Sequence, residues 1–180
     1  MPNPTVIAVA SDTAHNFSKP LRESIKLIAG WGVEGDAHAG KTVQHRSDKR
    51  RNPDAPNLRQ VHLMHAELFD YVSEFGMTVG AGQMGENITT RGIDILHLPR
   101  GTHLKIGEAV IEITGLRNPC KYLNYDAPGL MKACLARYED GTLFPQSGVM
   151  GIIISGGDVR AGDDIQIITP PEPHERLEPV

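Results

Sequence analysis

The segment Thr102-His103-Leu104-Lys105-Ile106-Gly107-Glu108-Ala109-Val110-Ile111-Glu112-Ile113-Thr114 decides the fold class. Leu104 and Ile106 alternate with polar residues before the central Gly107. Ile111 and Ile113 alternate with polar residues after it. Alternation with a period of two indicates a strand that is buried on one face. A glycine at the first position of a two-residue connection supplies the positive φ that a type II′ turn requires, so the segment predicts a β-hairpin.

Five other short, mainly apolar segments predict further strands. In chain order they are Val6–Ala10, Val61–Met64, Asn87–Thr90, Val149–Ile154 and Ile165–Ile168. Because the run Val149–Ile154 is apolar without interruption, it predicts a strand that is buried on both faces. Many short strands joined by glycine-rich turns favour a mostly β fold with a few helices (α+β), built as a closed or nearly closed β-barrel.

Two segments predict helices. Residues 66–75 place three apolar side chains along one face and stop at Gly76. These side chains are Leu68, Val72 and Phe75. Residues 130–138 follow Pro128-Gly129, and Cys134 lies on the face of this segment that we expect to be buried. We interpret Cys134 as a small apolar residue of the core.

The length of 180 residues suits one domain with a single core, and the hydrophobic content of 39% excludes a disordered chain. We predict one domain over residues 1–168, followed by a Pro/Glu-rich mobile tail over residues 169–180. Three prolines at positions 170, 171 and 173 cannot continue a helix or a sheet. The Pro-, Asn- and Asp-rich stretch 51–57 predicts a long surface loop.

The cysteine content and the N-terminus bear on the compartment. Cys120 and Cys134 are the 2 cysteines, too few for a disulfide scaffold, and they fit a reducing compartment. The N-terminal residues lack the basic and apolar pattern of a signal peptide, and no apolar run reaches the roughly 18 residues of a membrane span. These features predict a cytoplasmic protein with no membrane partner.

The charge is unevenly distributed. The net charge of −4 and the aromatic content of 5% argue against a nucleic-acid-binding protein, which is usually basic. Residues 41–60 nevertheless hold six basic residues and two acidic ones. A basic loop of this kind can concentrate an anionic small molecule. The alternative is a solvated insertion without a binding role.

Cys120 stands in a setting that suits chemistry. It ends the sequence Arg117-Asn118-Pro119-Cys120, directly after a predicted strand, and Lys121 follows it. Neighbouring cations favour the thiolate, which is the form that attacks sulfur or binds a soft metal. A partly buried structural cysteine is the alternative.

Two glycine-rich loops carry polar residues that can form a site. Residues 32–40 contain Asp36 and His38, and an aspartate beside a histidine can fix the tautomer of the ring. Residues 80–86 lead into Glu86-Asn87, where backbone N–H groups and an amide can hold an anion or a heterocycle. Solvated turns are the alternative for both loops. His62 and His65 resemble half of a zinc site, but no third ligand has a matching spacing, so we do not predict a metal there.

Taken together, these segments resemble the MOSC family, the domain named for the C-terminal part of molybdenum-cofactor sulfurases, and most closely its short standalone bacterial members. The matching pieces are residues 35–40 (Gly-Asp-Ala-His-Ala-Gly), 59–61 (Arg-Gln-Val), 85–88 (Gly-Glu-Asn-Ile), 92–95 (Gly-Ile-Asp-Ile), the hairpin 101–114, 117–120 (Arg-Asn-Pro-Cys) and 148–167. Their common order over residues 30–168 and the Pro-Cys step make the resemblance specific.

The resemblance implies a β-barrel and a set of site residues. Cys120 would either carry sulfur as a persulfide or ligate the molybdenum of a pyranopterin cofactor, and soft thiolate sulfur suits both roles. Asp36 and His38 would take part in catalysis beside it. The residues that would bind the anionic cofactor are Arg59, Glu86, Asn87 and Arg117. Arginines can hold its phosphate by bidentate hydrogen bonds.

Three functions follow from the resemblance. The first is a molybdenum-cofactor enzyme that reduces N-hydroxylated bases or related small N–O compounds, with an external electron donor because no Fe–S, flavin or haem motif is present. The second is a sulfur-transfer or carbon–sulfur-cleaving enzyme that uses Cys120 without molybdenum. In the second case a sulfur-donor protein is required. The third is a non-catalytic carrier of the cofactor.

Overall fold

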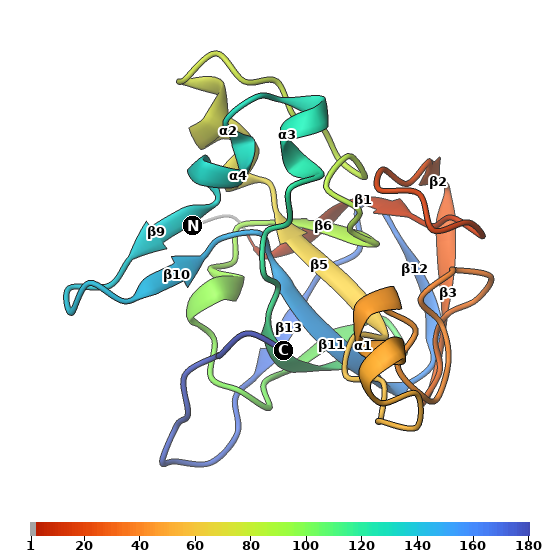
Figure 1. The fold of residues 1–180 in the computed structure, drawn as a ribbon. Coiled ribbons are helices and arrows are strands. Elements are labelled where there is room, and N and C mark those ends of the chain that lie inside the picture. Colours follow the sequence, from red (N-terminus) through yellow and green to blue (C-terminus); the bar gives the residue numbers. More distant parts are fainter. Residues whose placement is uncertain (1–2) are drawn as a thin grey trace.

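The hairpin predicted from residues 102–114 is confirmed in the computed structural model, which describes residues 3–180 (Figure 1). Strands β7 (His103–Ile106) and β8 (Ala109–Leu116) pair antiparallel, with His103 opposite Glu112 and Ile106 opposite Ala109. Gly107 in the connection has φ of 58°, in the left-handed region that favours glycine. The apolar residues of the alternating pattern are buried on the face that we expected.

The hairpin belongs to an eight-stranded sheet with the strand order β13-β7-β8-β11-β5-β6-β1-β2. The other members are β1 (Thr5–Ala10), β2 (Leu21–Arg22), β5 (Val61–His65), β6 (Ile88–Arg91), β11 (Val149–Ser155) and β13 (Gln166–Ile168). Strands β5 and β6 pair parallel, whereas the other neighbours are antiparallel. Strand β11 is buried over its first half, but Ile154 near its end is exposed.

Two smaller sheets complete the β structure of residues 3–180. One contains β3 (Ser24–Ile28), β4 (Gly32–Val33) and β12 (Gly157–Arg160), and the other contains β9 (Leu135–Arg137) and β10 (Leu143–Pro145). The fold is therefore mostly β with a few helices, as the sequence predicts.

The sequence predicts a closed or nearly closed barrel, and the main sheet is not closed into one, which corrects the closed form of that prediction. Its outer strands β13 and β2 are not paired with each other in the part of the chain that the structure describes. One bridge, between Thr5 and Asp164, links β1 to the residues just before β13. The backbone N–H of Val6 donates to the carbonyl of Asp163 at 2.9 Å. Alternation along a strand predicts the buried face of that strand but not which strand edges of the sheet pair. Here the contact between β1 and residues 163–164 is too short to form a continuous pair of strands.

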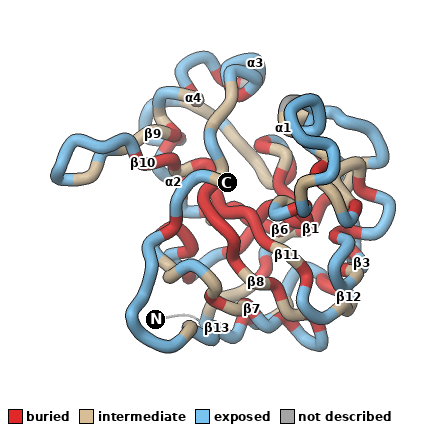
Figure 2. Tube along the Cα trace, turned by 60° about the horizontal axis from the view of Figure 1, so that its bottom comes forward, coloured by how far each residue is buried: buried red, intermediate tan, exposed pale blue. Residues whose placement is uncertain are grey.

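The buried side chains form two clusters. Figure 2 marks the buried residues along the chain in red. The larger one lies between the sheets and includes Leu104, Ile111 and Ile113 of the hairpin. The smaller one joins the main sheet to three helices, α2 (Glu67–Ser73), α3 (Leu123–Asp126) and α4 (Leu130–Ala133). A turn of 3₁₀-helix, η1 (Ile95–His97), packs into the larger cluster.

The predicted helices are shorter than expected. Helix α2 confirms the first one, but Phe75 lies beyond its end and is 62% exposed. The second, predicted over residues 130–138, ends at Ala133 because residues 135–137 pair with residues 143–145 in a hairpin. Cys134 caps α4, is fully buried in the smaller cluster, and burial raises the pKa of its thiol to about 11.

Part of the basic insertion is helical where the sequence predicts no helix. Helix α1 (Arg46–Arg51) lies on a loop whose base is closed by a bridge between Thr42 and Pro56. The N–H of Val43 donates to the carbonyl of Ala55 at 2.9 Å. Cations in the last turn of α1 also favour the helix, because the carbonyl end of a helix carries partial negative charge.

The end of the proline-rich tail lies along β8. Leu177 is buried, the N–H of Leu116 donates to the carbonyl of Glu178, and the N–H of Val180 donates to the carbonyl of Leu116. The mobility of residues 169–180 stays a prediction. No helix within residues 3–180 has both the length and the apolar character that crossing a bilayer requires.

Candidate functional site

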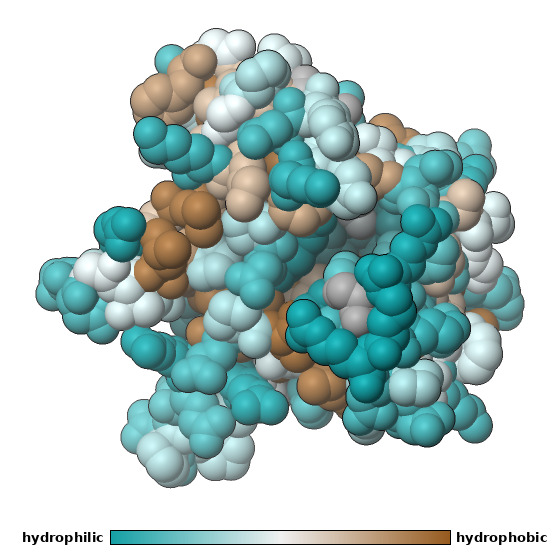
Figure 3. Space-filling model, in the orientation of Figure 1, coloured by the Kyte–Doolittle hydropathy of each residue, from teal (hydrophilic) through white to brown (hydrophobic). Residues whose placement is uncertain are grey.

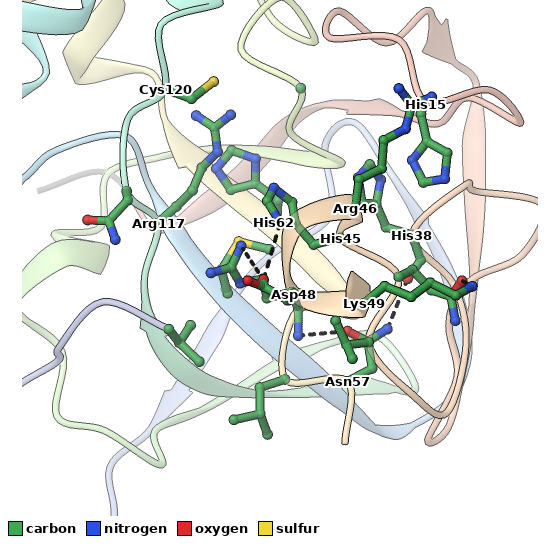
Figure 4. Close-up of a pocket in the computed structure, with 18 of the residues that line it drawn as sticks. His15, His38, His45, Arg46, Asp48, Lys49, Asn57, His62, Arg117 and Cys120 are labelled. Carbon is green, nitrogen blue, oxygen red and sulfur yellow. Dashed lines mark hydrogen bonds and ion pairs between the residues drawn. The ribbon is translucent and has the colours of Figure 1, made fainter. Parts of the chain in front are cut away.

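A cavity of about 1470 Å³ opens between α1 and the loop that follows β8 (Figures 3 and 4). Four stretches of the chain line most of it: residues 15–19, 38–62, 85–87 and 117–122. These stretches come from different parts of the sequence, and the fold brings them together because β5, β6 and β8 belong to the same sheet.

The cavity is strongly basic. Among its described lining residues, eight are Lys or Arg and one, Asp48, is acidic. The basic ones are Lys19, Arg46, Lys49, Arg50, Arg51, Arg59, Arg117 and Lys121. Since the whole chain carries a net charge of −4, this concentration of cations is local. A concave basic surface attracts anionic small molecules and repels cationic ones.

Cys120 and Arg117 lie together on one wall. Cys120 is half-buried on the loop after β8, and the Arg117 guanidinium extends toward it (Figure 4). The backbone of Arg117 is fixed, because its N–H donates to the carbonyl of Gly148 at 2.9 Å and its carbonyl accepts from Ser147 Oγ at 2.6 Å. Its guanidinium carbon lies 5.7 Å from the centre of the Phe17 ring.

The guanidinium of Arg117 is incompletely satisfied. Its Nη1 atom is buried and has no hydrogen-bond partner within residues 3–180. Burial lowers the pKa of Arg117, although nearby Cys120 and Glu86 oppose the shift. A buried N–H group without an acceptor costs about 1–3 kcal/mol, so this atom is a ready contact for an anionic ligand.

Asp36 sits behind the wall in a network of hydrogen bonds. Its Oδ2 atom accepts from Lys19 Nζ at 2.7 Å and from Asn87 Nδ2 at 2.9 Å. Its Oδ1 atom accepts from the backbone N–H of His38 at 3.0 Å. Burial opposes ionisation, but the hydrogen bonds from His38 and the Lys19 ammonium outweigh it and hold the pKa of Asp36 well below its ordinary value. Asp36 is therefore a permanent anion at neutral pH.

Asp36 orients the ring of His38. Nδ1 of His38 lies 3.3 Å from Asp36 Oδ1, and the side chain is 32% exposed at the cavity. An Nδ1–H group that donates to the carboxylate leaves Nε2 as the nitrogen that can accept or return a proton. The pair thus has the arrangement of a general acid–base group.

The structure brings six of the seven predicted site residues to the cavity or its wall and places Glu86 elsewhere. Glu86 is fully buried, and its carboxylate accepts from the N–H groups of Gly82 at 2.6 Å and Met84 at 3.1 Å. It stabilises its own loop and does not line the cavity. Asn87 does line it, but its Nδ2 donates to Ala10 O as well as to Asp36, so its amide is committed to positioning Asp36.

Arg59 lines the cavity at the base of α1. Its Nη1 lies 3.5 Å from Asp48 Oδ2, and burial lowers its pKa while Asp48 opposes the shift. Because the ion pair is long and the side chain is 28% exposed, Arg59 keeps donors available for an anion.

Sequence reasoning missed Lys19 and His62. Lys19 lies in a loop that carries no motif. Its side chain is only 2% exposed, but this burial results from packing in the fold, which the sequence does not show. His62 is buried at the cavity, its Nε2 lies 2.9 Å from the carbonyl of Ser147, and burial together with nearby Arg117 holds its pKa well below the ordinary value. His65 does not line the cavity, and no cluster of three or more metal-binding side chains occurs in the described chain.

Comparisons with known proteins agree with the resemblance. The sequence model of the MOSC domain matches residues 35–166. Protein YiiM of Escherichia coli (strain K12) is 32% identical over 99 residues, which are 55% of this chain and 42% of YiiM. The matched stretch thus spans less than half of that relative.

Solved structures share the fold. The YUAD protein of Bacillus subtilis is 20% identical, with a TM-score of 0.73 over 92% of this chain and 96% of that one. YiiM from Escherichia coli is 20% identical, with a TM-score of 0.63 over 97% of this chain and 73% of that one. At these identities the likeness concerns the fold alone.

Proposed function

The chain belongs to the MOSC domain family, and from this premise we propose that its basic cavity binds a molybdenum cofactor and that the protein reduces small N–O compounds such as N-hydroxylated bases. In this proposal the electrons come from an external donor protein. The proposed partners are therefore an anionic pterin, a small substrate and a redox protein.

One observation carries the proposal: Arg117 presents a buried, unpartnered Nη1 beside the half-buried thiol of Cys120. The proposed cofactor carries a metal and a phosphate. A soft sulfur ligand suits the metal, and an unsatisfied guanidinium suits the phosphate. The donor set of the cavity thus fits the cofactor. When bound, the molybdenum cofactor would supply two-electron redox chemistry at its metal.

The residues of the chain have separate roles in this proposal. Cys120 would hold the metal as a thiolate, and Arg117 with Arg59 would hold the phosphate by charge-assisted hydrogen bonds. Asn87 and Lys19 act indirectly. Both hold the Asp36 carboxylate by hydrogen bonds, and the Lys19 ammonium balances its negative charge. Asp36 in turn keeps His38 in one tautomer.

Reduction of a hydroxylamine to an amine consumes two electrons and two protons and releases water. In this proposal His38 Nε2 delivers protons to the leaving oxygen, because Nδ1 is held by Asp36. His62 is a poor proton donor, since its lowered pKa keeps it neutral. Its ring contacts the carbonyl of Ser147, and the hydroxyl of Ser147 donates to the carbonyl of Arg117. His62 therefore helps to fix the backbone of Arg117.

The test is the molybdenum content of protein purified from a molybdate-fed host. We expect stoichiometric metal in the natural chain, loss of the metal in Cys120→Ser, and retention in Cys134→Ala, because Cys134 is buried away from the cavity in the helical cluster. Circular dichroism checks that both variants fold.

Two other outcomes favour the alternatives. Metal-free protein with a labile sulfur on Cys120 would contradict the proposal and support a sulfur-transfer enzyme. Metal-loaded protein that shows no turnover with a reductant and N-hydroxylated bases would support a cofactor carrier.

A further inference from the structure

Helix α1 presents cations to the cavity that have no partner. Arg46, Arg50 and Arg51 line the cavity, are exposed, and form no ion pair with another described residue. Lys49 Nζ lies 3.3 Å from the amide oxygen of Gln44, which leaves its charge uncompensated. Asp48, the acidic residue of the helix, lies beside Arg59 at 3.5 Å.

These cations belong to a positioned element. The base of the α1 loop is closed by backbone hydrogen bonds, including one from Asn57 N–H to the carbonyl of Lys41 at 3.0 Å. The buried Asn57 amide also donates to the carbonyls of His38 at 2.9 Å and Gly40 at 3.0 Å. The helix is thus tied to the loop that carries His38, and its cations face the cavity from a fixed wall.

The α1 wall is separate from the wall that carries the thiol. Figure 4 shows Cys120 and Arg117 at one side of the cavity and Arg46 and Lys49 at the other, with His45 between them. The volume of about 1470 Å³ exceeds the roughly 300–1,000 Å³ of an ordinary small-molecule site, so both walls can be occupied together.

We propose that the α1 wall is a second anion site, which binds the phosphate of a phosphorylated small molecule while the remainder of that molecule extends toward Cys120. Three guanidinium groups and an ammonium suit a phosphate, which accepts bidentate and charge-assisted hydrogen bonds. Phe17 and the half-exposed Tyr122 also line the cavity, and their ring centroids lie 6.2 Å apart, so a flat heterocycle has aromatic surface to contact. The claim that this molecule is a substrate rests on the proposed function. The claim that the α1 wall binds its phosphate does not.

The test uses a matched pair of probes, adenosine 5′-monophosphate and adenosine, which differ by the phosphate. Binding to purified chain is measured by calorimetry at low ionic strength. We expect the phosphorylated probe to bind at least about tenfold more tightly than the nucleoside, a difference that added salt reduces.

Three variants locate the site. The triple variant Arg46→Gln/Arg50→Gln/Arg51→Gln should weaken binding of the phosphorylated probe by about tenfold or more, because each guanidinium contributes a charge-assisted contact. The triple variant Lys26→Gln/Lys105→Gln/Arg160→Gln removes the same charge from exposed positions outside the cavity and should change binding less than about twofold. Arg117→Gln tests the opposite wall and should weaken binding of the phosphorylated probe less than the α1 triple variant does.

Equal affinities for the two probes would overturn the inference. So would equal weakening by both triple variants, or loss of binding in Arg117→Gln with retention in the α1 variant. Molybdenum content keeps the two proposals distinguishable, because the α1 variant should still hold the metal. If that variant loses both the metal and the probe, α1 serves the cofactor, and the second site is wrong while the proposed function stands.

Discussion

The glycine-rich loops 32–40 and 80–86 each bury one carboxylate, and the two carboxylates have opposite surroundings. Asp36 pairs with Lys19 at 2.7 Å, and both side chains are 2% exposed. Glu86 is equally buried, but its partners are neutral: two backbone N–H groups and the hydroxyl of Thr89 at 3.0 Å.

The difference separates a carboxylate beside the candidate site from one that stabilises its own loop. Counter-charge and hydrogen bonds lower the pKa of Asp36 against the effect of burial, so this residue remains an anion that can orient His38. Burial raises the pKa of Glu86, and the hydrogen bonds from its own loop only oppose this shift. Lys19 joins the two loops, because its N–H donates to the carbonyl of Gly82 at 2.8 Å and its Nζ pairs with Asp36.

The largest effect should come from Lys19→Met, which leaves Asp36 as a buried charge without its counter-ion. We expect a loss of about 3–5 kcal/mol in the free energy of unfolding, measured by urea denaturation. Lys26→Met is the control, since the Lys26–Glu34 pair is exposed and 3.9 Å long, and should cost about 0.5 kcal/mol or less. Equal losses in the two variants would remove the distinction between the loops.

The next effect compares Gly82→Ala with Gly35→Ala. Both glycines have positive φ, 80° and 73°, so either alanine is strained by about 1–2 kcal/mol. A Cβ at Gly82 would also collide with the backbone carbonyl of Lys19, whereas a Cβ at Gly35 would meet open space. We expect a total of about 2–4 kcal/mol for Gly82→Ala by urea denaturation, because overpacking adds to the strain. A smaller cost for Gly82→Ala than for Gly35→Ala would contradict the close approach.

Glu86→Gln should have a smaller effect. The carboxamide keeps one acceptor oxygen and turns an NH₂ group toward a backbone donor, either Gly82 N–H or Met84 N–H. An unsatisfied buried donor costs about 1–3 kcal/mol, which thermal unfolding can detect. Glu34→Gln, at an exposed position, serves as the control and should leave the melting temperature unchanged.

The smallest effect is on the pH dependence of stability, and its sign should differ between the loops. The lowered pKa of Asp36 means that its stabilising contribution is present above the ordinary value of 3.8 and is lost as the pH falls below it. The raised pKa of Glu86 means that its contribution is present below 4.5 and is lost as the pH rises above it.

Urea denaturation between roughly pH 3 and pH 7 measures the contribution of each carboxylate to the free energy of unfolding. The natural chain is compared with Asp36→Asn and with Glu86→Gln. The stability advantage over Asp36→Asn should shrink as the pH falls, and the advantage over Glu86→Gln should shrink as the pH rises. Parallel curves for the two variants would show that the carboxylates titrate alike.

The strands could be predicted because their pattern is local. Apolar residues at every second position from Leu104 to Ile113 define a buried face whatever the rest of the chain does. Helix α1 could not, since Arg46–Arg51 has no apolar periodicity and its conformation depends on closure of the loop by residues 41–43 and 55–57. Whether the main sheet closes into a barrel likewise depends on contacts between β1 and the residues before β13, and these contacts do not close it.

The candidate site was partly predictable, through the resemblance. Cys120, Arg117, Asp36 and His38 carry motifs, and the structure brings them to one cavity or its wall. Lys19 carries none, because a lone lysine in a loop has no spacing that identifies its partner. Glu86 shares its motif with Asn87, but the sequence does not show that the carboxylate turns back onto its own loop.

The partners of β1 at Val6 bear on how the chain folds during synthesis. Strand β1 pairs with β6, whose last residue is Arg91, and Val6 also exchanges hydrogen bonds with residues 162 and 163. Residues 5–10 are translated before residues 162 and 163, so the backbone groups of Val6 wait for these residues to be made. At about 5–20 residues per second the delay is on the order of ten seconds. During that interval β1 has an open edge, which is where a nascent chain can pair with a neighbour on the same message.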